Sequence, residues 1–96
     1  MDNHYKKFQK HAELLKVLSH PVRLCIVKGL LEKERFNVSY MQQCLELPQS
    51  SISSHLQKLR SAGIVACERK GLEVTYWIAD ERVKSMLDIL FPHEEE

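Results

Sequence analysis

The stretch LPQSSISSHLQKLRSAGIV, residues 47–65, decides the fold. Ile52, Leu56 and Leu59 recur at the spacing that forms one apolar face of a helix, and Gly63 is expected to end it. Serines occupy several of the remaining positions, although alanine would favour a helix more strongly. Hydroxyl side chains on the outer face therefore indicate that something outside the helix contacts it.

A tight turn and a short helix precede this stretch. Ser39 and Gln42 have the spacing of a capping box, so a helix is expected to begin at Ser39. Pro48 ends that helix and separates it from the helix over residues 49–62. Two short helices joined by such a turn have the outline of a helix-turn-helix.

A hairpin and a last helix follow the stretch. Residues 64–79 alternate apolar and polar side chains, which predicts two strands with Arg69, Lys70 and Gly71 at their tip. Asp80 is expected to cap the last helix. Its apolar stripe comprises Val83, Met86, Leu87 and Leu90.

Two further helices are expected before Ser39. An amphipathic helix over residues 4–18 places Phe8, Ala12, Leu15 and Leu18 on one stripe. Pro21 suits the first position of a second helix, and residues 32–37 are expected to be a polar connector. The predicted fold is mainly α with a β-hairpin, in the order ααααββα, as a single domain over residues 1–96.

Composition describes an ordinary globular chain. Of the 96 residues, 44% are hydrophobic and 28% are charged, and no apolar run reaches the length of a membrane span. No signal peptide is visible, so a cytoplasmic protein without a membrane partner is expected. The net charge of +1 is unevenly distributed: basic side chains dominate residues 1–31, and acidic ones dominate residues 80–96. A nucleic-acid surface should therefore lie away from the C-terminus.

Three segments resemble the ArsR–SmtB family of bacterial winged helix-turn-helix repressors. AELLKVLSHPVRLCIVKGLL resembles that family's first two helices, residues 47–65 resemble its recognition segment, and RKGLEVTYWI resembles its wing. The words LPQS and GLE are similar to those of its PagR-like branch. The resemblance implies a homodimeric repressor without a cofactor. Such a dimer would bind double-stranded DNA at an imperfect palindrome, through residues 49–62 and the wing at residues 69–71.

The DNA-binding face follows from the resemblance and from the helical spacing together. With the apolar face of residues 49–62 turned inward, short polar side chains can reach phosphates or base edges in a major groove. Gln49 is the expected adenine reader, and the basic wing tip suits phosphate. Arg23 is expected to be a structural surface residue. The candidate DNA-binding residues are Gln49, Ser50, Ser51, Ser54, His55, Lys58, Arg60, Arg69 and Lys70.

The family pairs its subunits through the first and last helices, and the resemblance implies the same here. The apolar stripes at both ends of this chain provide the side chains for it, although part of each stripe must cover the chain's own core. The candidate dimer residues are Phe8, Leu15, Val83, Met86, Leu87 and Leu90.

Metal-binding relatives use ligands on the third or last helix, and this chain departs from both patterns. Residues 37–39, Asn-Val-Ser, supply no thiolate at the first site. At the second, Asp80 is kept but Arg82 stands where a histidine is expected, while His93 and Glu96 fall near later ligand positions. No metal site is therefore expected.

Three other functions remain open. Cys25 and Cys44 are candidates for a sensor of oxidants or reactive sulfur, although both lie on apolar helix faces, where free cysteine packs as a small hydrophobe. Cys67 is an alternative sensing thiol. A winged helix used only for protein interaction is another reading. An enzyme is disfavoured, because the chain has neither a nucleophile with its base nor a phosphate-binding glycine loop.

Overall fold

A computed structural model describes residues 4–33 and 36–92, except for the side chains of Phe36, Tyr40 and Cys44. The chain forms five α-helices among these residues, together with a short 3-10 helix and a three-stranded sheet. In chain order the elements are η1 (His4–Phe8), α1 (Gln9–Leu18), α2 (Pro21–Lys33), β1 (Phe36–Asn37), α3 (Val38–Leu45), α4 (Gln49–Ser61), β2 (Val65–Lys70), β3 (Glu73–Ile78) and α5 (Glu81–Leu90).

The core forms around the inner face of α4. The expected apolar face is confirmed, since Ile52, Leu56 and Leu59 are all 0% exposed. Burying a side chain of this size stabilises the fold by about 1.5–3 kcal/mol, so these three fix which face of α4 points inward. Most other elements add to the same core, with Leu14, Leu18, Ile26, Val27, Leu30, Met41, Ile64, Val65, Ile78, Val83 and Leu87.

The expected polar connector contains a strand instead. Phe36 and Asn37 form β1, which pairs antiparallel with β3 opposite Tyr76 and Thr75. The sheet order is therefore β1-β3-β2, with β3 in the centre. A two-residue strand is too short for a periodic sequence signal, and it forms because β3 offers it a free edge. The helix that follows starts at Val38, so Ser39 lies in its first turn and not before it.

The predicted hairpin and its tip are confirmed. Strands β2 and β3 pair antiparallel, from Val65 opposite Ile78 to Lys70 opposite Glu73. Gly71 has a φ of 64°, a conformation that glycine adopts without steric penalty. A glycine with positive φ at the first position of a two-residue loop matches the twist of the two strands. The hairpin is therefore a narrow wing that ends at residues 71–72.

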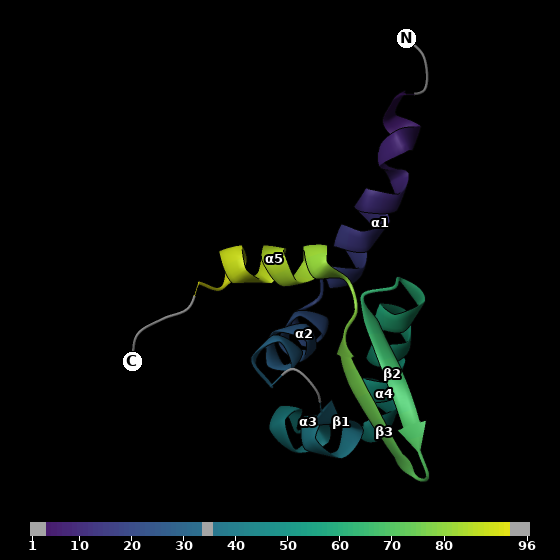
Figure 1. Cartoon of the computed structure of the whole chain (residues 1–96), viewed down its shortest axis with the longest axis vertical. Helices are drawn as coiled ribbons and strands as arrows, with labels where there is room; N and C mark the ends of the chain where they lie inside the picture. The colour runs from purple at the N-terminus through teal and green to yellow at the C-terminus, as the bar shows by residue number, and fades with distance from the viewer. Residues whose placement is uncertain (1–3, 34–35, 93–96) are drawn as a thin grey trace.

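The two ends of the molecule differ in character. Figure 1 shows η1 and α1 extending away from the body at one end and the β2–β3 tip lying at the other, while α5 crosses beside the base of α1. The N-terminal helix predicted over residues 4–18 is divided, because its first turns are the 3-10 helix η1. Among the described helices, none combines the length and apolar composition that a membrane crossing needs.

Candidate nucleic-acid interface

The outer face of α4 carries a dense set of polar side chains. Gln49, Ser50, Ser54 and Lys58 are exposed, and Ser51 is half-buried. Short hydroxyl side chains leave the helix backbone close to the molecular surface. The helix can therefore approach another macromolecule closely, with Gln49 on the side of the wing and Lys58 on the opposite side, and both side chains can donate hydrogen bonds.

The turn before α4 places Gln49 at the start of the helix. After α3 ends at Leu45, Glu46 adopts a left-handed conformation with a φ of 56°, which glycine or asparagine would adopt more readily. Pro48 then occupies the N-cap position in an extended conformation and supplies no side-chain cap. The Pro48 carbonyl accepts from the backbone N–H groups of Ser51 and Ile52, which fixes the first turn of α4 and places Gln49 at its start.

The wing tip lies next to the start of α4. A surface hollow of about 360 Å³ separates them, lined by Asn37, Val38, Ser39, Gln49, Leu72, Glu73 and Val74. Asn37 Nδ2 donates to Glu73 Oε2 at 2.9 Å, which ties the base of the tip to the strand before α3. The start of α4 and the wing tip consequently line one hollow, whereas Ser54 and Lys58 line a second hollow with residues of α1.

Leu72 was not anticipated as a functional residue. Arg69 and Lys70 are exposed at the wing, as the hypothesis of a basic tip requires. Leu72 stands between them and Glu73 and is 100% exposed. A fully exposed leucine at a hairpin tip could have been noticed in the sequence, because turn positions between charged strand ends usually carry polar residues.

His55 points toward α2, away from the serine face. Its Nδ1 atom lies 3.1 Å from Arg23 Nη1, and its ring centroid lies 4.6 Å from that of His20. Arg23 Nε also donates to the Val17 carbonyl at 2.6 Å. These internal contacts agree with the expectation that Arg23 is structural. Burial lowers the pKa of His55, and the charges of His20, Arg23 and Lys58 lower it further.

Arg60 lies on the hairpin side of α4. Its charge acts on Tyr76 of β3, where burial is the main cause of a raised pKa and the nearby Cys67 thiol raises it further. Arg60 is exposed, so its guanidinium stays available to solvent. It is therefore separated from the set formed by Ser54 and Lys58, which sits on the opposite side of the helix.

Comparison with known proteins places this arrangement in a family. The family described as "Helix-turn-helix domain" matches residues 18–68. The transcriptional repressor PagR of Bacillus anthracis is 40% identical over 88 residues, which are 92% of this chain and 88% of PagR. The crystal structure of PagR matches with a TM-score of 0.80 over 90% of this chain and 98% of that one.

The chain belongs to the ArsR–SmtB family of winged helix-turn-helix regulators.

A further relative supports the assignment, and a further solved structure shows the fold alone. The repressor SmtB of Mycobacterium tuberculosis is 44% identical over 71 residues, which are 74% of this chain and 52% of SmtB. The homodimeric winged helix-turn-helix domain Mb0332 of Mycobacterium bovis shares the fold, with a TM-score of 0.78 at 24% identity over 100% of this chain and 95% of that one.

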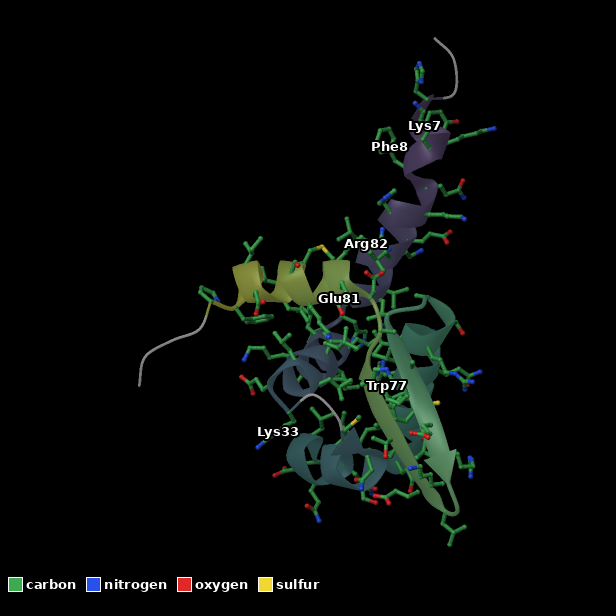
Figure 2. All side chains as sticks on the ribbon, viewed as in Figure 1. Lys7, Phe8, Lys33, Trp77, Glu81 and Arg82 are labelled. Atoms are coloured by element: carbon green, nitrogen blue, oxygen red, sulfur yellow. The ribbon has the colours of Figure 1, made fainter. Side chains whose placement is uncertain are left out.

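Apart from Leu72 at the wing tip, the large exposed apolar side chains of this family member lie on η1, α1 and α5. Phe8 and Leu15 are 62% and 53% exposed, and Figure 2 shows Phe8 on the part of the chain that extends beyond the body. On α5, Leu90 is exposed and Met86 is half-buried. Val83 and Leu87, expected at a dimer contact, instead pack inside the chain's own core with 0% and 1% exposure. Tyr5 and Ile89 are exposed apolar side chains that the sequence reasoning did not single out.

The start of α5 holds an ion pair where the family pattern would place a metal ligand. Asp80 caps the helix as predicted, accepting from the Arg82 backbone N–H at 2.9 Å. Arg82 Nη2 lies 2.7 Å from Asp80 Oδ2, and this hydrogen bond is the main cause of the lowered pKa of Asp80. Within residues 4–33 and 36–92, no three histidine, cysteine or acidic side chains converge on a common point. His93 and Glu96 lie outside the described residues.

One cysteine is placed differently from the expectation. Cys25 was expected to pack against the core, but it is exposed. It lies about 100° around α2 from Ile26 and about 150° from the middle of the buried face formed by Ile26, Val27 and Leu30. Cys67 is half-buried on β2. The side chain of Cys44 lies outside the described residues.

Proposed function

We propose that the protein is a dimeric, sequence-specific repressor that binds an imperfect palindrome through α4 and the wing. The observation that carries this proposal is the single surface shared by Gln49 at the start of α4 and the wing tip beyond it. The inner face of α4 is buried in the core, which fixes the position of its polar outer face. Repression is the activity named for the relatives PagR and SmtB.

Two sets of contacts would have different roles at the DNA. Ser50, Ser51, Ser54 and Lys58 would approach the major groove with Gln49, whose amide can both donate to and accept from an adenine edge. Arg69 and Lys70 would meet phosphate or the adjacent minor groove, which adds affinity for any sequence. Arg60 would reach a flanking phosphate from the hairpin side of α4.

The dimer would form through the exposed apolar side chains of η1, α1 and α5. Phe8, Leu15, Met86 and Leu90 serve this role, whereas Val83 and Leu87 support it from inside the subunit. Because the contact lies at the end opposite the wing, a two-fold axis there would leave both recognition surfaces free. The half-sites would then be centred about 34 Å apart, one turn of DNA.

The deciding experiment is selection of bound duplexes from a random pool, followed by binding measurements on the enriched sequence. A palindromic consensus with half-sites one turn apart would support the proposal. Retention on heparin without any enriched sequence would point to general polyanion binding. No binding to either would favour a winged helix that serves only protein interaction.

The proposed repressor does not respond to metal. Arg82 keeps a cation beside Asp80, and the thiolate ligands of the other family site are replaced by Asn37 and Ser39. Zinc, cadmium or arsenite added at concentrations that saturate metal-sensing relatives should leave the protein on its DNA. Release by any of them, reversed by a chelator, would contradict this part of the proposal.

A thiol-based sensor is the second candidate, favoured by the exposure of Cys25. An accessible thiol can react with oxidants, and a partner such as Cys44 would allow a disulfide to form. In that step peroxide takes two electrons from the two thiols, which lose their protons as the S–S bond forms. Loss of DNA binding on peroxide treatment that Cys25→Ser abolishes would support sensing, and unchanged binding would exclude it.

A further inference from the structure

His55 occupies a special position on the recognition helix. It lies one residue from Ser54 and three from Lys58, both of which are exposed, yet its own ring is half-buried against α2. Arg23 Nη1 approaches its Nδ1 atom to 3.1 Å, and the His20 ring lies beside it with centroids 4.6 Å apart. The ring is therefore held by another helix.

The groups that hold His55 are themselves fixed. Arg23 Nε donates to the Val17 carbonyl at the end of α1, at 2.6 Å. His20 Nδ1 accepts from the Val22 backbone N–H at 3.1 Å, which places His20 at the beginning of α2. We call His20, Arg23 and His55 the histidine clamp. It joins the end of α1 and the start of α2 to the middle of α4.

The clamp requires a neutral His55. A guanidinium can only donate, so the contact with Arg23 needs the lone pair of His55 at Nδ1 and leaves the ring proton on Nε2. Protonation would place a second cation against Arg23 and remove this lone pair. Burial, then the charges of His20 and Arg23 on α2 and Lys58 on α4, all oppose that protonation and lower the pKa of His55.

We propose that His55 is a positioning residue: Arg23 and His20 hold it neutral, and through it they fix how α4 presents its serine face. The core contacts of Ile52, Leu56 and Leu59 are apolar and lack direction, whereas the contact between Arg23 and His55 is directional. This inference rests on the proposed function. In it, His55 sets the orientation of α4 and does not itself contact a base.

A specific pH response follows from the clamp. Below the ordinary titration range of histidine, protonation of His55 breaks the contact with Arg23, and the serine face loses its fixed orientation. Binding to the selected operator should then weaken. Binding to random DNA does not need that orientation and gains from the added positive charge. The ratio of operator to random affinity should therefore fall several-fold between about pH 8 and about pH 4.5, which is about two units below the ordinary histidine pKa, because the pKa of His55 is lowered.

Two substitutions test this response. In His55→Asn the amide oxygen can occupy the place of Nδ1 and accept from Arg23 without titrating, so the affinity ratio should stay high at both pH values. In His55→Phe the ring remains but the acceptor is lost, so the ratio should be low at both. A wild-type ratio that does not change with pH, or a His55→Asn variant that follows the wild type, would overturn the proposal.

A measurement without DNA separates the clamp from the proposed function. Proton NMR of the His55 ring during a pH titration should give a pKa below the ordinary histidine range, moving back toward that range in Arg23→Gln. The dispersion of the remaining spectrum would show that this variant is folded. An ordinary pKa in a protein that binds its operator would refute the clamp alone. A lowered pKa in a protein that binds no DNA would refute the proposed function and, with it, a role for the clamp in recognition.

Discussion

The wing provides the sharpest quantitative prediction. Replacing Arg69 and Lys70 with alanine removes two exposed cations from the tip of each hairpin, which makes four in a dimer. If each neutralises one phosphate, the slope of log K against log salt concentration should become shallower by about 3 to 4, since each phosphate contributes about 0.9. Between about 50 and about 200 mM salt, the wild type should then lose about 100-fold more affinity than the variant does.

Fluorescence anisotropy with a labelled operator, repeated at several salt concentrations, measures both slopes. The matched control is the double change of Lys6 and Lys7 to alanine, which removes the same charge from the end opposite the wing. Its slope should stay within about one unit of the wild type. Equal slopes for the wing variant and the wild type would refute the assignment of the wing, and equal losses in both variants would show that only net charge matters.

Three further predictions concern the dimer, the α5 cap and the wing tip. Leu90→Glu should yield folded monomers by light scattering, whereas Leu87→Glu should unfold the protein because it buries an unpaired charge; a folded Leu87→Glu dimer would contradict this. Asp80→Ala should lower the free energy of unfolding by about 1 kcal/mol near neutral pH. Because the pKa of Asp80 is lowered in the folded protein, its charge stabilises the fold above about pH 4, and the stability difference between wild type and Asp80→Ala should shrink as the pH falls through the folded pKa. Asp80→Asn keeps a capping side chain and should therefore lose less stability at neutral pH. Leu72→Ser should weaken binding without changing the salt slope, because no charge is lost; an unchanged affinity would leave Leu72 without a role at the DNA.

Local patterns were sufficient for the buried face of α4, the hairpin and the start of α5. Ile52, Leu56 and Leu59 predicted the buried face of α4 because each helical turn repeats its inward direction, and the glycine in Arg69-Lys70-Gly71 predicted the wing tip because a tight hairpin needs a positive φ. Asp80 predicted the start of α5 because its carboxylate can accept the free N–H groups there. These signals are local, so a single chain carries them in full.

Contacts between distant segments were not readable in the same way. The apolar stripe of α5 gave no way to separate Val83 and Leu87, which face the core, from Leu90, which faces solvent, because the division depends on where α2 and β3 lie. Cys25 lies in an apolar stretch of α2, so it was expected to be buried. The buried face of α2 is instead centred on Val27 and Leu30, which leaves Cys25 exposed. The strand at residues 36–37 exists only because β3 presents an edge beside it.

The sequence by itself determined the order of helices, the hairpin and the helix-turn-helix, because these follow from spacing along the chain, and three of its segments carried the likeness to ArsR–SmtB regulators. Only the tertiary structure decided that His55 turns from the outer face of α4 to meet Arg23 and His20. His55 is 32 positions from Arg23 in the sequence, and no periodicity links the two. The burial and charge that make a histidine neutral come from neighbours in space, so its role appears only after the helices have packed.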